Sequence, residues 1–228
     1  MAGISTDYFA VVSSAPSAPP GVPAGETAIR FNHANGHLYA WDPTGSGAWV
    51  DTTGSGGGGS GLPVVVTQTL AASAASISLT SLPGTYTSLL IHVLARADTS
   101  GGGGPIKCQM NGDTGANYDW YSYDLFYASA AHAQGIGATA ANVGAYSDTL
   151  AAAGTFSFSE ILLPMYAGGT YKTFSGRGNW IQAQASGDIN AMQFAGEWRS
   201  TAAITSLLLS TSAGNFVAGT KVVVYGLA

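Results

Sequence analysis

The side chains that could serve as acids, bases or nucleophiles are few and are not grouped into a catalytic motif. His92 falls inside an apolar run and His132 in a predicted loop, while Glu160 and Glu197 stand in predicted strands. There is no Gly-x-Ser-x-Gly elbow, no His-Glu-x-x-His sequence and no local carboxylate pair of the glycosidase type. The sequence therefore predicts no catalytic residue and no enzymatic activity. The arginines expected to pair with the two glutamates are Arg96, Arg177 and Arg199.

The segment 111–120, NGDTGANYDW, is the most distinctive polar stretch. Asn111, Gly112 and Asp113 begin like a calcium-binding loop, but the EF-hand spacing and its terminal glutamate are missing. A hairpin turn accounts for the same residues, because Asn and Gly readily adopt positive φ angles. We interpret the segment as a turn, with a calcium or sugar contact as the alternative.

Aromatic and acidic side chains follow this turn along a predicted strand, Tyr118–Tyr127. Such a strand can form a shelf on which sugars stack, or the centre of an interface between subunits. The interface is the preferred interpretation. The residues predicted to form this contact are Asp119, Trp120, Tyr121, Tyr123 and Tyr127.

No metal or other cofactor is expected. His33 and His37 flank the hairpin signal Asn35-Gly36 with no cysteine or third ligand nearby, so they are interpreted as turn histidines. Cys108 is the only cysteine, which excludes an intrachain disulfide. It lies in a predicted strand and is expected to be a small packing residue.

Composition limits the classes of partner. Of the 228 residues, 46% are hydrophobic and only 8% are charged, and the net charge of −5 leaves no basic stripe for nucleic acid. No apolar run reaches the ~18 residues that span a membrane. The N-terminus lacks the positive region of a signal peptide. This low fraction of charged residues is typical of a protein whose surface is covered by partner subunits. The alternative explanation is a general compositional bias toward alanine and glycine.

The first 61 residues are expected to form three segments. Residues 1–25 contain a proline-rich stretch and should be an extended anchoring arm or a disordered tail. Residues 26–51 read as a small β-meander, which is too short to fold without a partner. Residues 52–61 are a Gly/Ser linker, whether natural or engineered. The residues predicted to make virion-attachment or oligomer contacts are Tyr8, Phe9, Phe31, Tyr39, Trp41 and Trp49.

From residue 62 to 228 the sequence predicts an antiparallel β-sandwich of the jelly-roll type, built from many short strands bounded by turn residues. Residues 138–153 are expected to be a long loop, because Gly144 interrupts a weak apolar pattern. The last segment, 203–228, is expected to be two strands joined by a turn and to belong to the core. The predicted fold is therefore all-β, with an arm and a meander before the sandwich.

Two groups of residues carry a resemblance to a known family. NGDTGANY at 111–118 and WRSTAAITSLLLSTSAGNFVAGTKVVVYGL at 198–227 resemble the C-terminal β domain of tailed-bacteriophage appendage proteins, such as tail fibres and head fibres. The resemblance covers residues 64–228 and implies a homotrimer on the outside of a virion, bound to tail or capsid proteins. An exposed knob in contact with a host-surface glycan or protein is expected to use the Gly- and Ala-rich loops near 98–104 and 128–153. The alternatives are a capsid decoration (cement) protein and a carbohydrate-binding module.

Overall fold

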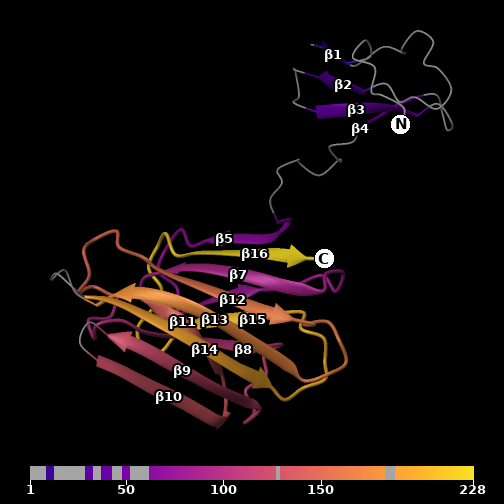
Figure 1. The fold of residues 1–228 in the computed structure, drawn as a ribbon. Coiled ribbons are helices and arrows are strands. Elements are labelled where there is room, and N and C mark those ends of the chain that lie inside the picture. Colours follow the sequence, from indigo (N-terminus) through magenta and orange to yellow (C-terminus); the bar gives the residue numbers. More distant parts are fainter. Residues whose placement is uncertain are drawn as a thin grey trace. The chain divides into compact units, whose positions relative to one another are not determined.

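A computed structural model of the chain describes residues 9–12, 29–32, 37–42, 48–51, 62–126, 129–182 and 188–228. The chain divides into two compact units, Met1–Gly61 and Leu62–Ala228. Every regular element in these described residues is a β-strand (Figure 1), which confirms the predicted all-β class.

The N-terminal unit contains one four-stranded sheet, in the order β1-β2-β3-β4. β2, β3 and β4 are antiparallel neighbours, as the hairpin signal at Asn35-Gly36 predicts. β1 instead runs parallel to β2 within the same chain. The described part of the predicted arm is therefore a strand of the meander sheet. The bounds are β1 (Phe9–Val12), β2 (Ile29–Asn32), β3 (His37–Asp42) and β4 (Ala48–Asp51).

The C-terminal unit contains a larger sheet of eight strands, all antiparallel to their neighbours. These strands are β5 (Val64–Thr69), β7 (Ser88–Ala95), β9 (Tyr118–Phe126), β10 (Ser129–Ala138), β12 (Ser157–Pro164), β13 (Lys172–Ile181), β14 (Ile189–Trp198) and β16 (Lys221–Leu227). Their order is β10-β9-β14-β13-β12-β7-β16-β5, with β10 and β5 at the two edges (Figure 1).

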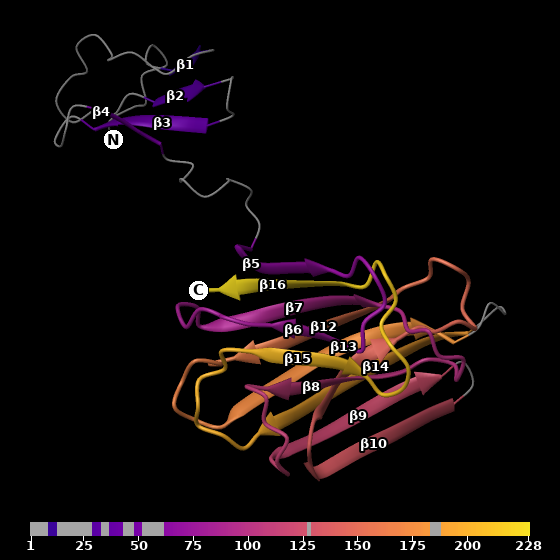
Figure 2. The same ribbon diagram turned by 180° about the vertical axis from the view of Figure 1, so that it is seen from behind.

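A smaller sheet of four antiparallel strands packs on one face of the larger one, as the view from behind shows (Figure 2). Its strands are β6 (Ser76–Leu79), β8 (Gly104–Met110), β11 (Ala141–Tyr146) and β15 (Leu207–Thr211), in the order β11-β8-β15-β6. The predicted sandwich is thus confirmed, but its two unequal sheets exceed the eight strands of a jelly roll.

Alternating side chains build the core between the two sheets. In β7, Leu89, Ile91 and Val93 are buried while the residues between them face the other side. β15 likewise contributes Leu207 and Leu209. This period of two is the pattern from which the strands were predicted. Cys108 of β8 is buried in the same core, and its burial raises the pKa of the thiol to about 12, so it is a packing residue as expected.

The predicted loop at 138–153 is wrong, because residues 141–146 form β11 of the smaller sheet. Gly144 has a φ of 150°, and a Cβ atom there would lie 2.5 Å from Oγ of Ser159 in the facing sheet. Ala145 N–H donates to the same hydroxyl at 3.0 Å, and Ser157 donates to the Ala145 carbonyl at 2.6 Å. Small side chains therefore let two backbones approach each other, where the sequence suggested a break.

The terminal segment is not a hairpin. β15 belongs to the smaller sheet, between β8 and β6, whereas β16 belongs to the larger sheet, between β7 and β5. The chain between them crosses the sandwich, where Phe216 is fully buried and pairs with Ala74 and Ala97. The prediction that both strands belong to the core is confirmed, since Val222 and Val224 are buried.

Candidate functional site

The turn at 111–113 joins two distant parts of the C-terminal unit. Asn111 and Gly112 have φ angles of 54° and 68°, as a turn requires. The Asn111 side chain donates to the Ala203 carbonyl at 2.7 Å and accepts from Thr205 N–H at 2.8 Å. This confirms the turn interpretation and ties the two segments that carry the family resemblance to each other.

The Asp113 carboxylate is occupied by hydrogen bonds within the fold. It accepts from the Trp198 indole N–H at 2.6 Å, from the Asn117 amide at 2.9 Å and from Gly115 N–H at 2.8 Å. These donors, Trp198 first among them, hold the pKa of Asp113 below its usual value. The structure therefore gives this carboxylate a structural role. Elsewhere in the described residues, no cluster of three or more His, Cys, Asp or Glu could hold a metal ion.

The predicted contact strand divides between the two faces of the larger sheet. Tyr121 and Tyr123 lie on the outer face, with side chains 48% and 45% exposed, together with Leu125. Trp120 lies on the opposite face and packs against the core beside Gly135, where a Cβ atom would lie 2.4 Å from the indole nitrogen. The Trp120 side chain therefore lies on the other face of the sheet from the two tyrosines, and Tyr127 lies outside the described residues.

The exposed residues of β9 and β10 form what we call the outer shelf, on the face that the smaller sheet leaves uncovered. The His132 ring stacks on Tyr121, with ring centres 5.9 Å apart and planes 13° apart. A groove of about 500 Å³ lies beside the shelf and is lined in part by Tyr123, Leu125 and Phe158. The members of the outer shelf are Tyr121, Tyr123, Leu125, His132 and Ile136, of which Ile136 is 74% exposed.

Asp119, another predicted contact residue, is engaged at one end of the shelf. Its carboxylate forms an ion pair with Arg199 and accepts from Gly137 N–H at 2.7 Å. Arg199 and this hydrogen bond lower the pKa of Asp119. The prediction that Arg199 pairs with Glu197 or Glu160 is therefore wrong, and the shelf has little free hydrogen-bonding capacity at this end.

Further along the same face, three strands bring a charged row together. Glu160 of β12 accepts from Arg177 of β13 at 3.1 Å, as predicted, and its other oxygen lies 3.3 Å from Nε2 of His92 of β7. The His92 ring lies edge-on to Phe158 and Tyr225, each with ring centres 5.1 Å away. His92 is thus packed between aromatic rings.

Arg96 does not pair with either glutamate. Its guanidinium donates to the carbonyl oxygens of Ala151, Ala152 and Thr155 at 2.8–3.0 Å. It therefore fastens the loop 147–156 to the end of the sheet, and is a positioning residue for that loop.

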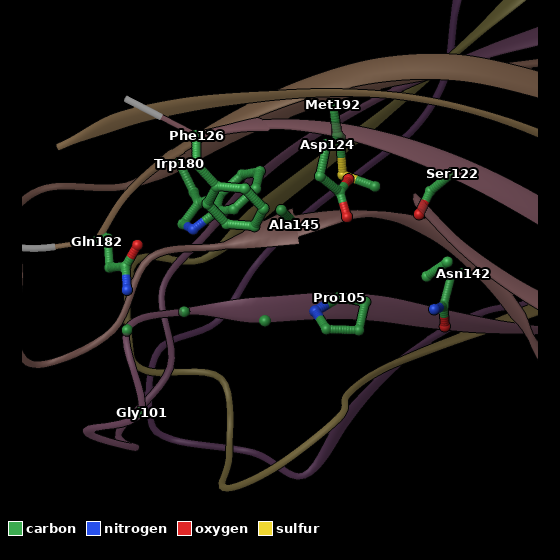
Figure 3. A pocket seen from close by; sticks show the side chains of 14 residues that line it. Gly101, Pro105, Ser122, Asp124, Phe126, Asn142, Ala145, Trp180, Gln182 and Met192 are labelled. Carbon is green, nitrogen blue, oxygen red and sulfur yellow. The ribbon is translucent and has the colours of Figure 1, made fainter. Parts of the chain in front are cut away.

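A cavity of about 300 Å³ lies between the two sheets and is lined by residues of β9 and β10 from the larger sheet and by residues 101–105 at the start of β8. Figure 3 shows Asp124 pointing into it, with Trp180 and Phe126 together at one side. The two rings meet edge to face, 5.7 Å between centres. The remaining lining residues are Gly101, Gly102, Gly103, Gly104, Pro105, Ser122, Ala133, Asn142, Ala145, Gln182 and Met192.

Sequence reasoning missed this cavity, although it named the strand that supplies its carboxylate. Alternation along β9 was a usable signal, because Ser122, Asp124 and Phe126 share the face opposite to Tyr121 and Tyr123. What the sequence does not contain is the pairing that brings β13 and β14 beside β9, with Trp180 and Met192 on that same face.

The predicted attachment residues that the structure describes are spread over all four strands of the N-terminal unit. Phe9 lies in β1, Phe31 in β2, Tyr39 and Trp41 in β3, and Trp49 in β4. Trp41 and Trp49 are directly opposite each other in the register of β3 and β4. Tyr8 and His33 lie outside the described residues.

Two negative findings complete the description of the chain. Within the described ranges, no helix is long and apolar enough to cross a membrane. Comparison with protein-family models, with curated proteins and with solved structures found no match for this chain.

Proposed function

We propose that this chain is a non-enzymatic structural protein of a phage particle, a short trimeric fibre on the outside of the virion. Its N-terminal unit attaches it to tail or capsid proteins, and its C-terminal sandwich is an exposed knob. The assignment to a phage rests on the resemblance of residues 111–118 and 198–227. In support, the bond between Asn111 and Ala203 joins these two segments in space.

The observation that carries the contact function is the outer shelf. Tyr121, Tyr123, Leu125 and Ile136 are all 45% or more exposed on one uncovered sheet face. A contiguous group of large apolar side chains on an otherwise packed domain is typical of an interaction surface. With only 8% charged residues, the chain has few charges that would oppose association through this face.

A copy of this chain fits the shelf better than a sugar does. Sugar sites pair aromatic rings with free polar groups, but the Asp119 carboxylate at the end of the shelf is already held by Arg199 and Gly137. One face of Tyr121 is also taken by His132. The apolar side chains of the shelf can still be buried against another chain, and such burial is the main source of free energy in a subunit interface. We therefore assign the shelf to contacts between subunits of the trimer.

The test is the mass of the protein in solution, measured by size-exclusion chromatography with light scattering at micromolar concentration. The full chain should elute with the mass of three chains. The triple variant Tyr121→Ser, Tyr123→Ser, Leu125→Ser should elute as one chain, because each change removes exposed apolar area without touching the core. Its circular dichroism should be unchanged.

A matched control uses two exposed apolar residues outside the shelf, Met165 (58% exposed) and Tyr171 (55% exposed). The double variant Met165→Ser, Tyr171→Ser should remain trimeric. A full chain that stays monomeric would refute the trimer, and a triple variant that stays trimeric would move the contact away from the shelf.

Location on the particle is tested separately by imaging virions that carry a labelled version of the chain. Label at the tips of short appendages supports the fibre. Label spread over the capsid lattice supports a decoration protein instead. In that case, deletion of residues 1–25 should abolish capsid binding without changing adsorption to the host.

A further inference from the structure

The inter-sheet cavity contains an acidic group, Asp124, one of whose carboxylate oxygens has no partner within the fold. Oδ1 of Asp124 is buried and accepts no hydrogen bond, and it is the only buried side-chain nitrogen or oxygen of the described residues in that condition. Most buried polar groups find a partner, so an exception requires an explanation. In Figure 3 the carboxylate points into the cavity between Ser122 and Met192.

The fold also leaves this carboxylate without a counter-ion. Asp124 is the only ionisable residue among the described residues that line the cavity. Another acidic group borders the glycine loop: Asp148 accepts from Gly102 N–H at 2.6 Å and from Leu150 N–H at 3.0 Å. On the adjoining strand β10, His132 faces the outer shelf and stacks on Tyr121 instead. No cation of the described chain thus compensates Asp124.

Three further polar side chains of the cavity can accept hydrogen bonds, whereas the indole N–H of Trp180 can only donate. Ser122 offers a hydroxyl, and Asn142 and Gln182 offer side-chain carbonyls; neither amide side chain bonds to another described residue. An ammonium group has three N–H donors and no acceptor. It would therefore find a carboxylate and further acceptors around one small space.

From this arrangement we infer that the cavity binds a small organic molecule through a primary ammonium group, with Asp124 as its ion-pair partner. The inference concerns the face opposite to the outer shelf and does not depend on the proposed function. A quaternary ammonium would leave the acceptors unused, and a neutral alcohol would leave the carboxylate without a counter-charge.

The walls indicate where the rest of such a molecule would lie. Phe126, Trp180 and Met192 form an apolar side of the cavity, next to the carboxylate. Aromatic rings attract cations as well as hydrocarbon, so this side suits a short aliphatic chain bearing the charge. At about 300 Å³ the cavity is at the small end of ligand sites, which favours a compact ligand over a chain of several rings.

The glycines of the 101–104 loop keep the cavity open. A Cβ atom at Gly103 would lie 2.7 Å from the Trp180 ring and 2.5 Å from the Tyr146 carbonyl, and Gly103 has a φ of 85°. Any larger residue would be strained there and would clash with the Trp180 ring, so the shape of the cavity depends on glycine at this position.

The ionisation of Asp124 provides a second readout. Burial raises the pKa of its carboxyl above the usual value, and hydrogen bonding with Ser122 offsets this only in part. Cation binding needs the ionised form, so the affinity should fall as the pH is lowered through this pKa. Alkylammonium groups stay protonated over that range, since a lysine has a pKa near 10.4.

The experiment is an NMR titration of the full chain at pH 7 with n-butylammonium chloride, following the amide signals of Gly102–Gly104 and the indole signal of Trp180. A saturable shift is expected, and 1-butanol and tetramethylammonium should bind at least tenfold more weakly than butylammonium. In Asp124→Asn, the butylammonium affinity should fall at least tenfold. Glu197→Gln, which removes a carboxylate outside the cavity, should bind like the unaltered chain.

Asp124→Asn is expected to fold normally. Asp124→Asn removes an uncompensated buried charge, so its thermal midpoint at pH 7 should equal or exceed that of the unaltered chain. Three results would overturn the inference: no saturable shift with butylammonium, which would make the cavity a hydrated void; equal affinity in Asp124→Asn; or equal affinity for glucose, which would make it a site for neutral polyols.

Discussion

At the scale of single residues, Asp113 connects the turn at 111–113 to the far end of β14. Its carboxylate binds the indole of Trp198, the amide of Asn117 and the backbone of Gly115, and these donors lower its pKa. The folded state therefore favours the ionised form more than the unfolded chain does. That contribution to stability is present above the unfolded pKa of about 3.9 and is lost as the pH falls through the lower, folded value.

We accordingly predict that Asp113→Asn lowers the free energy of unfolding by about 1 kcal/mol at pH 7, since solvent reaches part of the turn and weakens such bonds. Urea unfolding at several pH values measures this. The difference from the unaltered chain should shrink as the pH falls below about 3.9.

Trp198→Phe is the matched control for this prediction, because it removes the indole donor and keeps an aromatic ring. It should reproduce part of the same pH-dependent loss. A difference between Asp113→Asn and the unaltered chain that is constant from pH 7 to pH 3 would show that the ionised carboxylate is not the source of the effect.

At the scale of elements, two glycines in β13 and β14 are covered by aromatic rings from the neighbouring strand. Gly176 is opposite Phe194, and Gly196 is opposite Phe174. A Cβ atom at Gly176 would lie 2.3 Å from the Phe194 ring and 2.1 Å from the Glu160 carbonyl. Each ring thus fills the space that the opposite strand leaves, and the pair fixes the register of the two strands.

The prediction is that Gly176→Ala destabilises the C-terminal unit by about 1–3 kcal/mol, the cost of forcing extra volume into a packed site. In a domain of this size each kcal/mol corresponds to about 2–4 °C in the thermal midpoint, which calorimetry resolves. Gly169→Ala, at a site with no atom within 4 Å of an added Cβ, should have little effect. Equal midpoints for the two variants would show that the ring moves aside without cost.

The strands that the sequence predicted and those that it did not differ in one physical respect. β7 and β14 bury large apolar residues at alternate positions, Leu89, Ile91 and Val93 in one and Met192, Phe194 and Trp198 in the other. Such a period of two identifies a half-buried strand without any knowledge of its neighbours. β10 and β11 lack that pattern. β10 is an exposed edge strand of mainly small residues, and β11 uses alanines and Gly144 because Ser157 and Ser159 face it closely.

Local sequence patterns also do not predict to which of the two sheets a strand belongs. The terminal strands β15 and β16 look like a hairpin in sequence, but their partners are β8 and β6 on one side and β7 and β5 on the other. For the same reason the sequence predicts Tyr121 and Tyr123 as contact residues together with Trp120, which lies on the other face, and does not identify Asp124 as a cavity residue. Which face is covered depends on strands far away in the sequence.

At the scale of the whole molecule, the two units are built independently. Each sheet draws its strands from one unit only, and the C-terminal unit forms the core of the sandwich from its own residues. Residues 62–228 are long enough to form a core without help.

We therefore predict that residues 62–228, produced alone, unfold at the same temperature as the C-terminal unit of the full chain. Because the outer shelf lies entirely within them, this fragment should also keep the mass of three chains. Calorimetry and light scattering check the two statements separately. A folded but monomeric fragment would transfer the trimer contact to the N-terminal unit, and an unfolded fragment would contradict the independence of the units.

One consequence of the sheet order concerns how the chain is made. β5 pairs only with β16. Residues 64–69 therefore have no strand partner until residues 221–227 have been synthesised. Until that late segment has been synthesised, β7 also has an open edge along which other chains could add. The larger sheet is completed by pairing strands that are far apart in the sequence, and such non-local pairing slows folding. Yield at high expression temperature should accordingly be limited by aggregation during synthesis, while the finished protein remains stable.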